Sequence, residues 1–166
     1  SRMGAEVTGI DAGDENIKVA KIHARRSDLE IRYETLLPEN FVKQGRSFDV
    51  VLNLEVIEHV ANPKSFISAC GALVKPGGVM VCATLNRTLK SLLLAKIGAE
   101  YILRWLPRGT HDWRMFFKPS EFCALLRGQG FTISDISGLN YSILFDDWFL
   151  TKDISINYML FAKKFS

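Results

Sequence analysis

The chain has 166 residues, of which 48% are hydrophobic, so it can bury one good core and one domain over residues 1–166 is expected. The net charge of +3 is too small to indicate a nucleic-acid-binding protein, and no aromatic and basic interleaving of the RNA-binding type occurs. The three cysteines form no C-x-x-C pair, which favours free thiols over a disulfide framework or a zinc site.

The N-terminal part of the chain predicts a strand, a helix and a second strand. Residues 6–11 are typical of a short strand that ends on an acid, Asp11. The turn residues that follow predict a helix over about 15–26. A brief strand is expected at 29–33. The inner face of the predicted helix consists of Ile17, Ala20 and Ala24.

The middle of the chain repeats this alternation. The apolar, β-branched run that begins at Phe48 predicts a strand buried on both faces. Asn62 and Pro63 predict the start of a helix that runs to about Val74 and is stopped by K-P-G-G. Residues 79–84 are again typical of a buried strand. Strands and helices that alternate every thirty residues or so predict a doubly wound, mostly parallel α/β sheet.

From Arg87 the pattern changes. A leucine-rich segment over 89–106 predicts a helix that interrupts the alternation, so a helical insertion is expected at about 87–118. A helix is expected over 119–129. Two closing strands, 131–138 and 154–163, follow with no helix between them, which predicts an antiparallel pair at the sheet edge.

A polar triplet follows the strand that begins at Phe48. Glu55, Glu58 and His59 stand at i, i+3 and i+4, so a helical backbone would turn all three to one side. Ligands of open α/β sheets bind outside the carboxyl ends of the strands, where this triplet falls. Two acids and an imidazole at that place indicate a functional site.

Four motifs carry a family resemblance. V-T-G-I-D-A at 7–12, F-D-V-V-L-N-L-E-V-I-E-H-V at 48–60, L-V-K-P-G-G at 73–78 and T-L-N-R at 84–87 resemble class I S-adenosylmethionine-dependent methyltransferases. The stretch from Thr84 to Met159 is similar to the ubiquinone biosynthesis O-methyltransferase family. The resemblance implies a Rossmann-like sheet whose last strand is antiparallel, and methylation of phenolic hydroxyls on polyprenyl catechol or demethylubiquinol intermediates.

The sequence departs from this family at its N-terminal end. The glycine-rich loop after the family's first strand is absent, and residues 1–5 resemble the end of the helix that should follow it. We therefore expect the first strand to be missing and the chain to be the C-terminal part of a methyltransferase domain. A complete cofactor site is not expected from these residues alone.

Three residues are assigned to S-adenosylmethionine by the resemblance. Asp11 ends a strand where an acid can accept hydrogen bonds from both ribose hydroxyls, although a helix N-cap is the alternative role. Ala12 would lie against the adenine, and Leu54 would pack on the cofactor unless it is a core residue. An NAD-binding sheet is a further alternative from position alone, but the E-H-V and K-P-G-G elements point away from it.

The triplet allows three interpretations. In the first, the three residues do no more than shape the cofactor pocket, as an E-H pair does in many methyltransferases. One of them could be the general base that removes the phenol proton. The two carboxylates, with His59 nearby, could instead hold a divalent metal such as Mg²⁺, as the resemblance implies. His111 is a weaker candidate to face the substrate, and His23 is expected to be structural.

The expected function is therefore phenol O-methylation in ubiquinone biosynthesis. A methyltransferase that acts on another small molecule, at oxygen or carbon, is one alternative. A cofactor-free scaffold of the same fold is another, and the missing glycine loop would permit it. Other ubiquinone-biosynthesis proteins are expected partners.

The insertion predicts a contact with an anionic membrane surface. Between Arg87 and Lys118 the chain has seven basic residues and two acids, a balance of +5. Residues 87–108 combine this charge with a broad leucine-rich surface and Trp105, which suits a helix lying in the interface. A lid packed on the domain's own core is the alternative. No signal peptide is visible, so we expect a cytoplasmic protein peripheral to the inner face of a bacterial membrane, or one on the matrix side in mitochondria.

Overall fold

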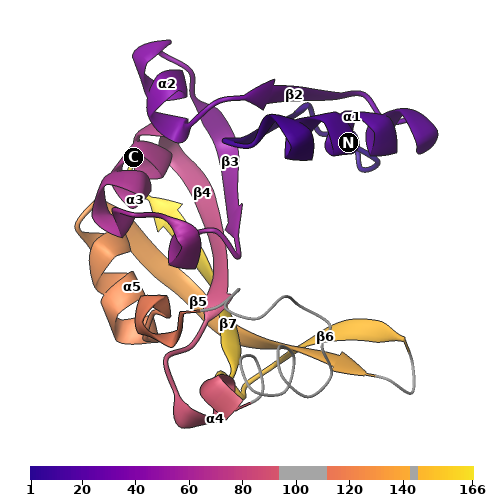
Figure 1. Cartoon of the computed structure of the whole chain (residues 1–166). Coiled ribbons are helices and arrows are strands. Elements are labelled where there is room, and N and C mark those ends of the chain that lie inside the picture. The colour runs from indigo at the N-terminus through magenta and orange to yellow at the C-terminus, as the bar shows by residue number, and fades with distance from the viewer. Residues whose placement is uncertain (94–111, 143–145) are drawn as a thin grey trace. The chain divides into compact units, whose positions relative to one another are not determined.

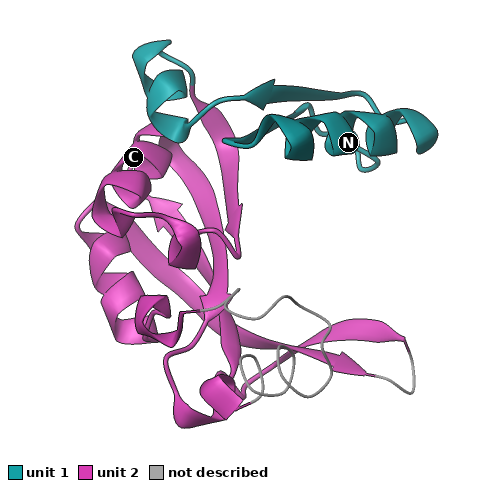
Figure 2. Ribbon diagram, in the orientation of Figure 1, with its two compact units in different colours: residues 1–46 teal, residues 47–166 magenta. Residues whose placement is uncertain are grey.

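The computed structural model describes residues 1–93, 112–142 and 146–166. The chain divides into two compact units, Ser1–Arg46 and Ser47–Ser166 (Figure 2). Each unit has its own sheet, two-stranded in the first and five-stranded in the second. The single domain expected over residues 1–166 stays a prediction.

The first unit follows the predicted strand, helix and strand. Strand β1 (Val7–Asp11), helix α1 (Asp14–Arg26) and strand β2 (Ile31–Thr35) are followed by a short helix, α2 (Pro38–Lys43). The strands pair in parallel, with Val7 opposite Ile31. Ile17 and Ala24 of the predicted inner face are buried and Ala20 is partly buried. Strand β2 begins two residues later than predicted, and α2 replaces an expected connection because Pro38 occupies its first turn, where a missing N–H costs nothing.

The second unit contains the remaining elements (Figure 1). Its strands are β3 (Phe48–Leu54), β4 (Val74–Leu85), β5 (Phe131–Ser142), β6 (Asp147–Thr151) and β7 (Asn157–Lys164). The helices among its described residues are α3 (Pro63–Leu73), α4 (Leu89–Ser91) and α5 (Pro119–Arg127), with 3₁₀ turns η1 (Ile57–His59) and η3 (Trp113–Met115).

The strand order in this sheet is β3-β4-β7-β5-β6. Strands β3 and β4 are parallel, and β7 is antiparallel to both β4 and β5. Strands β3, β4 and β5 therefore run in one direction. The antiparallel pairing of the two closing strands is confirmed, but their placement at the edge is wrong. Strand β7 lies inside the sheet, and the edge is β6, a strand between the two closing strands that was not predicted and that pairs with β5.

The core of the second unit lies between the sheet and helices α3 and α5, which cover the same face (Figure 1). Its large side chains that are almost fully buried include Ile57, Ile67, Met80, Phe122, Leu126, Phe131, Tyr158 and Leu160. Helix α3 begins as predicted, with Asn62 Oδ1 accepting a hydrogen bond from Ser65 N at 3.1 Å. Strand β3 turns alternate residues away from this core, and Val50, Leu52 and Leu54 are exposed. The strand is therefore not buried on both faces as predicted.

Most of the predicted insertion helix lies outside the described residues. Only Leu89–Ser91 are described as helix α4, and Thr88 caps them by accepting a hydrogen bond from Ser91 N. No helix among the described residues is long and apolar enough to cross a membrane. The predicted interfacial helix and the placement of His111 are therefore not described.

Gly138, in β5, packs against the backbone of the loop before β7. A Cβ there would collide with the Asp153 carbonyl, because Gly138 packs directly on the backbone of that loop. Gly138→Ala should lower the free energy of unfolding of the full-length protein by at least about 2 kcal/mol, since a well-packed backbone cannot yield. Gly128→Ala, whose added Cβ would meet its nearest atoms at 3.4 Å, is the control. Equal stability of the two variants, measured by denaturant unfolding, would contradict this close packing.

Candidate active site

The candidate site lies at the carboxyl ends of the parallel strands β3 and β4. The Glu55 N–H donates to the Ala83 carbonyl at 2.9 Å, so β3 stays attached to β4 one residue beyond its end. Glu55 then adopts a φ of 54°, in the left-handed region. A residue with a Cβ pays about 1 to 3 kcal/mol for such a conformation, which is found mainly at functional sites and turns. The chain turns there directly into η1, which carries Glu58.

Glu58 is a buried acid, with 4% of its surface exposed. Its Oε2 accepts a hydrogen bond of 2.9 Å from the hydroxyl of Thr84, on β4. Its Oε1 is also buried and receives no hydrogen bond from the groups that the structure describes. A proton on Glu55, a water or a cation is therefore needed to satisfy this oxygen.

Glu55 and Glu58 form a carboxyl pair. Glu55 is exposed as a residue, but its carboxyl group is turned toward Glu58 and largely shielded. Burial, which is the largest cause, together with the hydrogen bond to Glu58 and the negative charge of Glu58, raises the pKa of Glu55 from its ordinary value of 4.5 to about 8. Two carboxyl groups this close favour a state in which one is protonated.

His59, the third residue of the triplet, is exposed. The backbone after β3 forms a 3₁₀ turn instead of an α-helix, so Glu58 points into the core while the next residue, His59, is exposed. The predicted orientation of the triplet to one side is therefore wrong. Within the part of the chain that the structure describes, no group of three or more His, Cys, Asp or Glu side chains could hold a metal ion. Metal binding and catalysis by Glu55, Glu58 and His59 stay predictions.

The residues assigned to the cofactor lie in different units, and each is described by itself. Asp11, at the end of β1, accepts hydrogen bonds at Oδ1 from Gly13 N at 2.6 Å and from Asn16 Nδ2 at 3.1 Å. The N-cap of α1 is Gly13, so Asp11 braces the turn and is not itself the cap. Ala12 is exposed, as is Leu54 at the end of β3. Their contact with S-adenosylmethionine stays a prediction.

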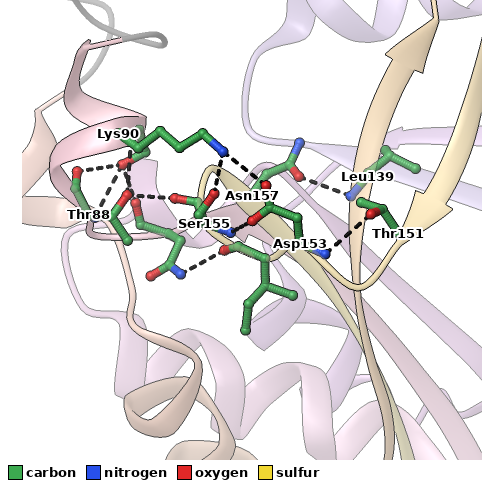
Figure 3. Close-up of polar contacts among 10 residues, drawn as sticks. Thr88, Lys90, Leu139, Thr151, Asp153, Ser155 and Asn157 are labelled. Atoms are coloured by element: carbon green, nitrogen blue, oxygen red, sulfur yellow. Dashed lines mark hydrogen bonds and ion pairs between the residues drawn. The ribbon is translucent and has the colours of Figure 1, made fainter.

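A polar network, which the sequence did not predict, lies beyond the end of β4 (Figure 3). Asn86 Nδ2 donates to the Ile154 carbonyl at 2.8 Å, and the Thr88 hydroxyl donates to the Ser155 carbonyl. Lys90 Nζ lies 2.9 Å from Asp153 Oδ2 and 2.9 Å from the Ser155 hydroxyl. Hydrogen bonds from Ser155 and Lys90 hold the pKa of Asp153 well below its ordinary value. These bonds tie the start of the insertion to the loop before β7.

Trp113, near the end of the insertion, is hydrogen-bonded to Thr88, near its start. The Trp113 indole N–H, in η3, donates to the Thr88 carbonyl at 2.9 Å. The two ends of the segment that begins after Thr88 and ends before Trp113 therefore meet beside the end of β4. Thr84, Asn86 and Ser91 are buried polar residues of this region, and the sequence did not identify them as site residues. The signal that could have identified Thr84 was its polarity at the end of an otherwise apolar strand.

Known proteins resemble this chain in sequence. Residues 1–136 match the family described as methyltransferase domain. The ubiquinone biosynthesis O-methyltransferase of Mesorhizobium japonicum is 49% identical over 164 residues, which are 99% of this chain and 66% of that protein. The protein of the same name from Caulobacter vibrioides is 50% identical over 165 residues, 99% of this chain and 66% of its own length. The predicted resemblance is thus confirmed, and this chain spans just under two thirds of these curated relatives.

Solved structures show the same fold. A magnesium protoporphyrin IX methyltransferase from Synechocystis with bound SAH has a TM-score of 0.70 and 19% identity, covering 98% of this chain and 66% of that one. A SAM-dependent methyltransferase from Methanosarcina mazei has a TM-score of 0.67 and 17% identity, covering 98% and 84%. The [4+2]-cyclase SpnF has a TM-score of 0.64 and 14% identity, covering 96% and 66%. The predicted Rossmann-like class I methyltransferase fold is confirmed.

The raised pKa of Glu55 generates a prediction about pH. Between the ordinary value of 4.5 and about 8 the folded protein holds a proton that the unfolded chain has released, so the free energy of unfolding should fall as the pH rises through this range. Glu55→Gln should flatten this slope, because glutamine does not titrate. Denaturant unfolding of the full-length protein in chelator, at several pH values, measures it. Glu6→Gln, at an exposed glutamate, should leave the slope unchanged; an identical slope in Glu55→Gln would disprove the carboxyl pair.

Proposed function

The chain belongs to the methyltransferase domain family, and we propose that it transfers the methyl group of S-adenosylmethionine to a phenolic oxygen of a polyprenyl catechol or demethylubiquinol intermediate in ubiquinone biosynthesis. The names of the relatives that are about half identical to the chain support this activity. The observation in the structure that carries it is the carboxyl pair of Glu55 and Glu58 at the carboxyl ends of β3 and β4. Substrates of open α/β sheets bind at this edge.

The carboxyl pair suits the chemistry of a phenol. A phenolate attacks the sulfonium methyl group better than a neutral phenol does, so the reaction needs a group that takes up the phenol proton. Glu55, with a pKa of about 8, can exchange a proton near neutral pH. The carboxylate of Glu58, the second of the pair, is held in place by its hydrogen bond from Thr84. His59 is exposed and next in sequence to Glu58, so it remains a second candidate for the base.

The two carboxylates also fit a divalent cation such as Mg²⁺. The buried Oε1 of Glu58 lacks a donor among the described residues, and a hard cation prefers carboxylate oxygens. Glu55 and Glu58 would hold such an ion, with His59 nearby and water completing its shell. When bound, the ion would lower the pKa of a phenol that coordinates it.

Asp11 is the proposed partner of the cofactor ribose. Its Oδ1 is already held by Gly13 N and Asn16 Nδ2, which fix the direction of the carboxylate. Its Oδ2 then accepts from the ribose hydroxyls, a charge-assisted bond that is stronger than a neutral one. Ala12 and Leu54, both exposed, would pack on the adenine and on the rest of the cofactor.

We retain the anionic membrane surface and other ubiquinone-biosynthesis proteins as proposed partners, with a position on the inner or matrix face of the membrane. The charge balance of residues 87–118 supports the membrane contact. Two of the basic residues are already paired with acids, Arg87 with Glu121 and Lys90 with Asp153. Attraction to anionic lipid would therefore come from the other basic residues of the segment.

The fold alone would allow another chemistry, because the neighbour SpnF is named a cyclase. Methyl-labelled S-adenosylmethionine and a short-chain prenyl catechol distinguish the possibilities. The full-length protein should place the label on a ring oxygen, and the same ring with both hydroxyls capped should receive none. A label on a ring carbon would indicate the alternative methyltransferase. Binding of S-adenosylhomocysteine without any transfer would indicate the scaffold.

The ribose contact of Asp11 gives a separate prediction. Asp11→Ala should weaken binding of S-adenosylhomocysteine by the full-length protein about 5-fold to 150-fold, because the ribose hydroxyls lose an acceptor worth about 1 to 3 kcal/mol. Titration calorimetry measures this change. Asp14→Ala is the matched control, since Asp14 is exposed and bonded to Lys18. Equal affinity of the two variants would remove Asp11 from the cofactor site.

A further inference from the structure

Thr84 is a polar residue at the buried end of an apolar strand. It is completely buried, and the same stretch of β4 places Met80 and Cys82 in the core. Its hydroxyl donates to Glu58 Oε2 at 2.9 Å. Valine, which has nearly the same shape, would fill this position without any need for a hydrogen-bond partner. The hydroxyl therefore has a role beyond filling space.

Neighbouring residues of β4 hold both members of the carboxyl pair. Ala83 accepts the backbone N–H of Glu55 at 2.9 Å, and Thr84 binds the side chain of Glu58. The interior strand β4 thus fixes where Glu55 leaves the sheet and how the carboxylate of Glu58 is turned. With Oε2 held by Thr84, the plane of the Glu58 carboxylate is set and Oε1 is the oxygen left for another group.

That remaining oxygen indicates a ligand. Oε1 is buried, and no residue in the described ranges donates a hydrogen bond to it. Leaving a buried acceptor unsatisfied costs about 1 to 3 kcal/mol, and more if the acceptor is charged. A carboxylate that is held firmly on one side and left open on the other is the arrangement by which second-shell groups orient a metal-binding carboxylate.

We propose that Thr84 is a positioning residue, whose hydroxyl turns the Glu58 carboxylate so that Oε1 faces a divalent cation held with Glu55. This inference rests on the proposed function, because the cation is part of that proposal. Thr84 does not touch the cation or the substrate. It acts only through Glu58, and its contribution is the direction of one carboxylate.

Binding of Mn²⁺ to the full-length protein, measured by titration calorimetry in the presence of S-adenosylhomocysteine, tests the role of Thr84 without requiring turnover. Thr84→Val should weaken Mn²⁺ binding about 10-fold to 100-fold, the usual effect of losing an outer-shell partner. Thr84→Ser keeps the hydroxyl and should stay within about threefold of the wild type. Thr132→Val, the same change at an exposed strand position, is the control and should have no effect.

A double-mutant cycle separates positioning from general stability. In a Glu58→Gln background, Thr84→Val should cause no additional loss of Mn²⁺ binding, because the carboxylate that it orients is gone. Thr84→Ala replaces the valine variant if the latter fails to fold, as judged by circular dichroism. Losses that add in the double mutant, or a serine variant as weak as the valine variant, would overturn the proposal.

The Mn²⁺ titration and the methylation assay together distinguish failure of this inference from failure of the proposed function. If Mn²⁺ binds and Thr84→Val weakens it while no catechol is methylated, the positioning role stands and the proposed function fails. If the wild type methylates the catechol but binds no Mn²⁺, the function stands and the positioning of Glu58 toward a cation is wrong.

Discussion

The hydrogen bond from Thr84 to Glu58 is the interaction on which the candidate chemistry depends. Glu58 is a buried acid, and this bond satisfies one of its two carboxylate oxygens. Without this bond a buried carboxylate would be neutralised or expelled, since an unpaired buried charge costs several kcal/mol. The raised pKa of Glu55 follows from the same arrangement, because its carboxyl group is shielded and lies beside Glu58. Parallel pairing of β3 and β4 is what brings the two acids and Thr84 to one edge.

Much of the fold could be predicted because its signals are local. The turn before α1 and the Asn62–Pro63 start of α3 specify their helices within a few residues. Strand β6 was missed because its residues, D-W-F-L-T, show no apolar and polar alternation, and its pairing with β5 depends on the hairpin that the two strands form. The interior position of β7 was missed for the same reason. Pairing order in a sheet is set by contacts between distant segments, which periodicity does not report.

The sequence predicted the two acids of the candidate site but not the backbone geometry that holds them. Glu55 and Glu58 were identified from their place after a strand, and the structure brings them together. The assumption of α-helical spacing failed because Glu55 has a left-handed backbone and a 3₁₀ turn follows it, which leaves Glu58 buried and His59 exposed. Thr84 was not identified because it lies 26 residues after Glu58, on another strand. Only the parallel register of β3 and β4 makes them neighbours.

A crystal structure of the full-length protein with S-adenosylhomocysteine and Mn²⁺, located by its anomalous scattering, tests the account most directly. The account predicts an ion about 2.0 to 2.3 Å from Oε1 of Glu58, a Glu55 oxygen on the same ion, and Thr84 still bonded to Oε2. An ion bound elsewhere, or a Glu58 carboxylate turned away from Thr84 when the ion is bound, would contradict it.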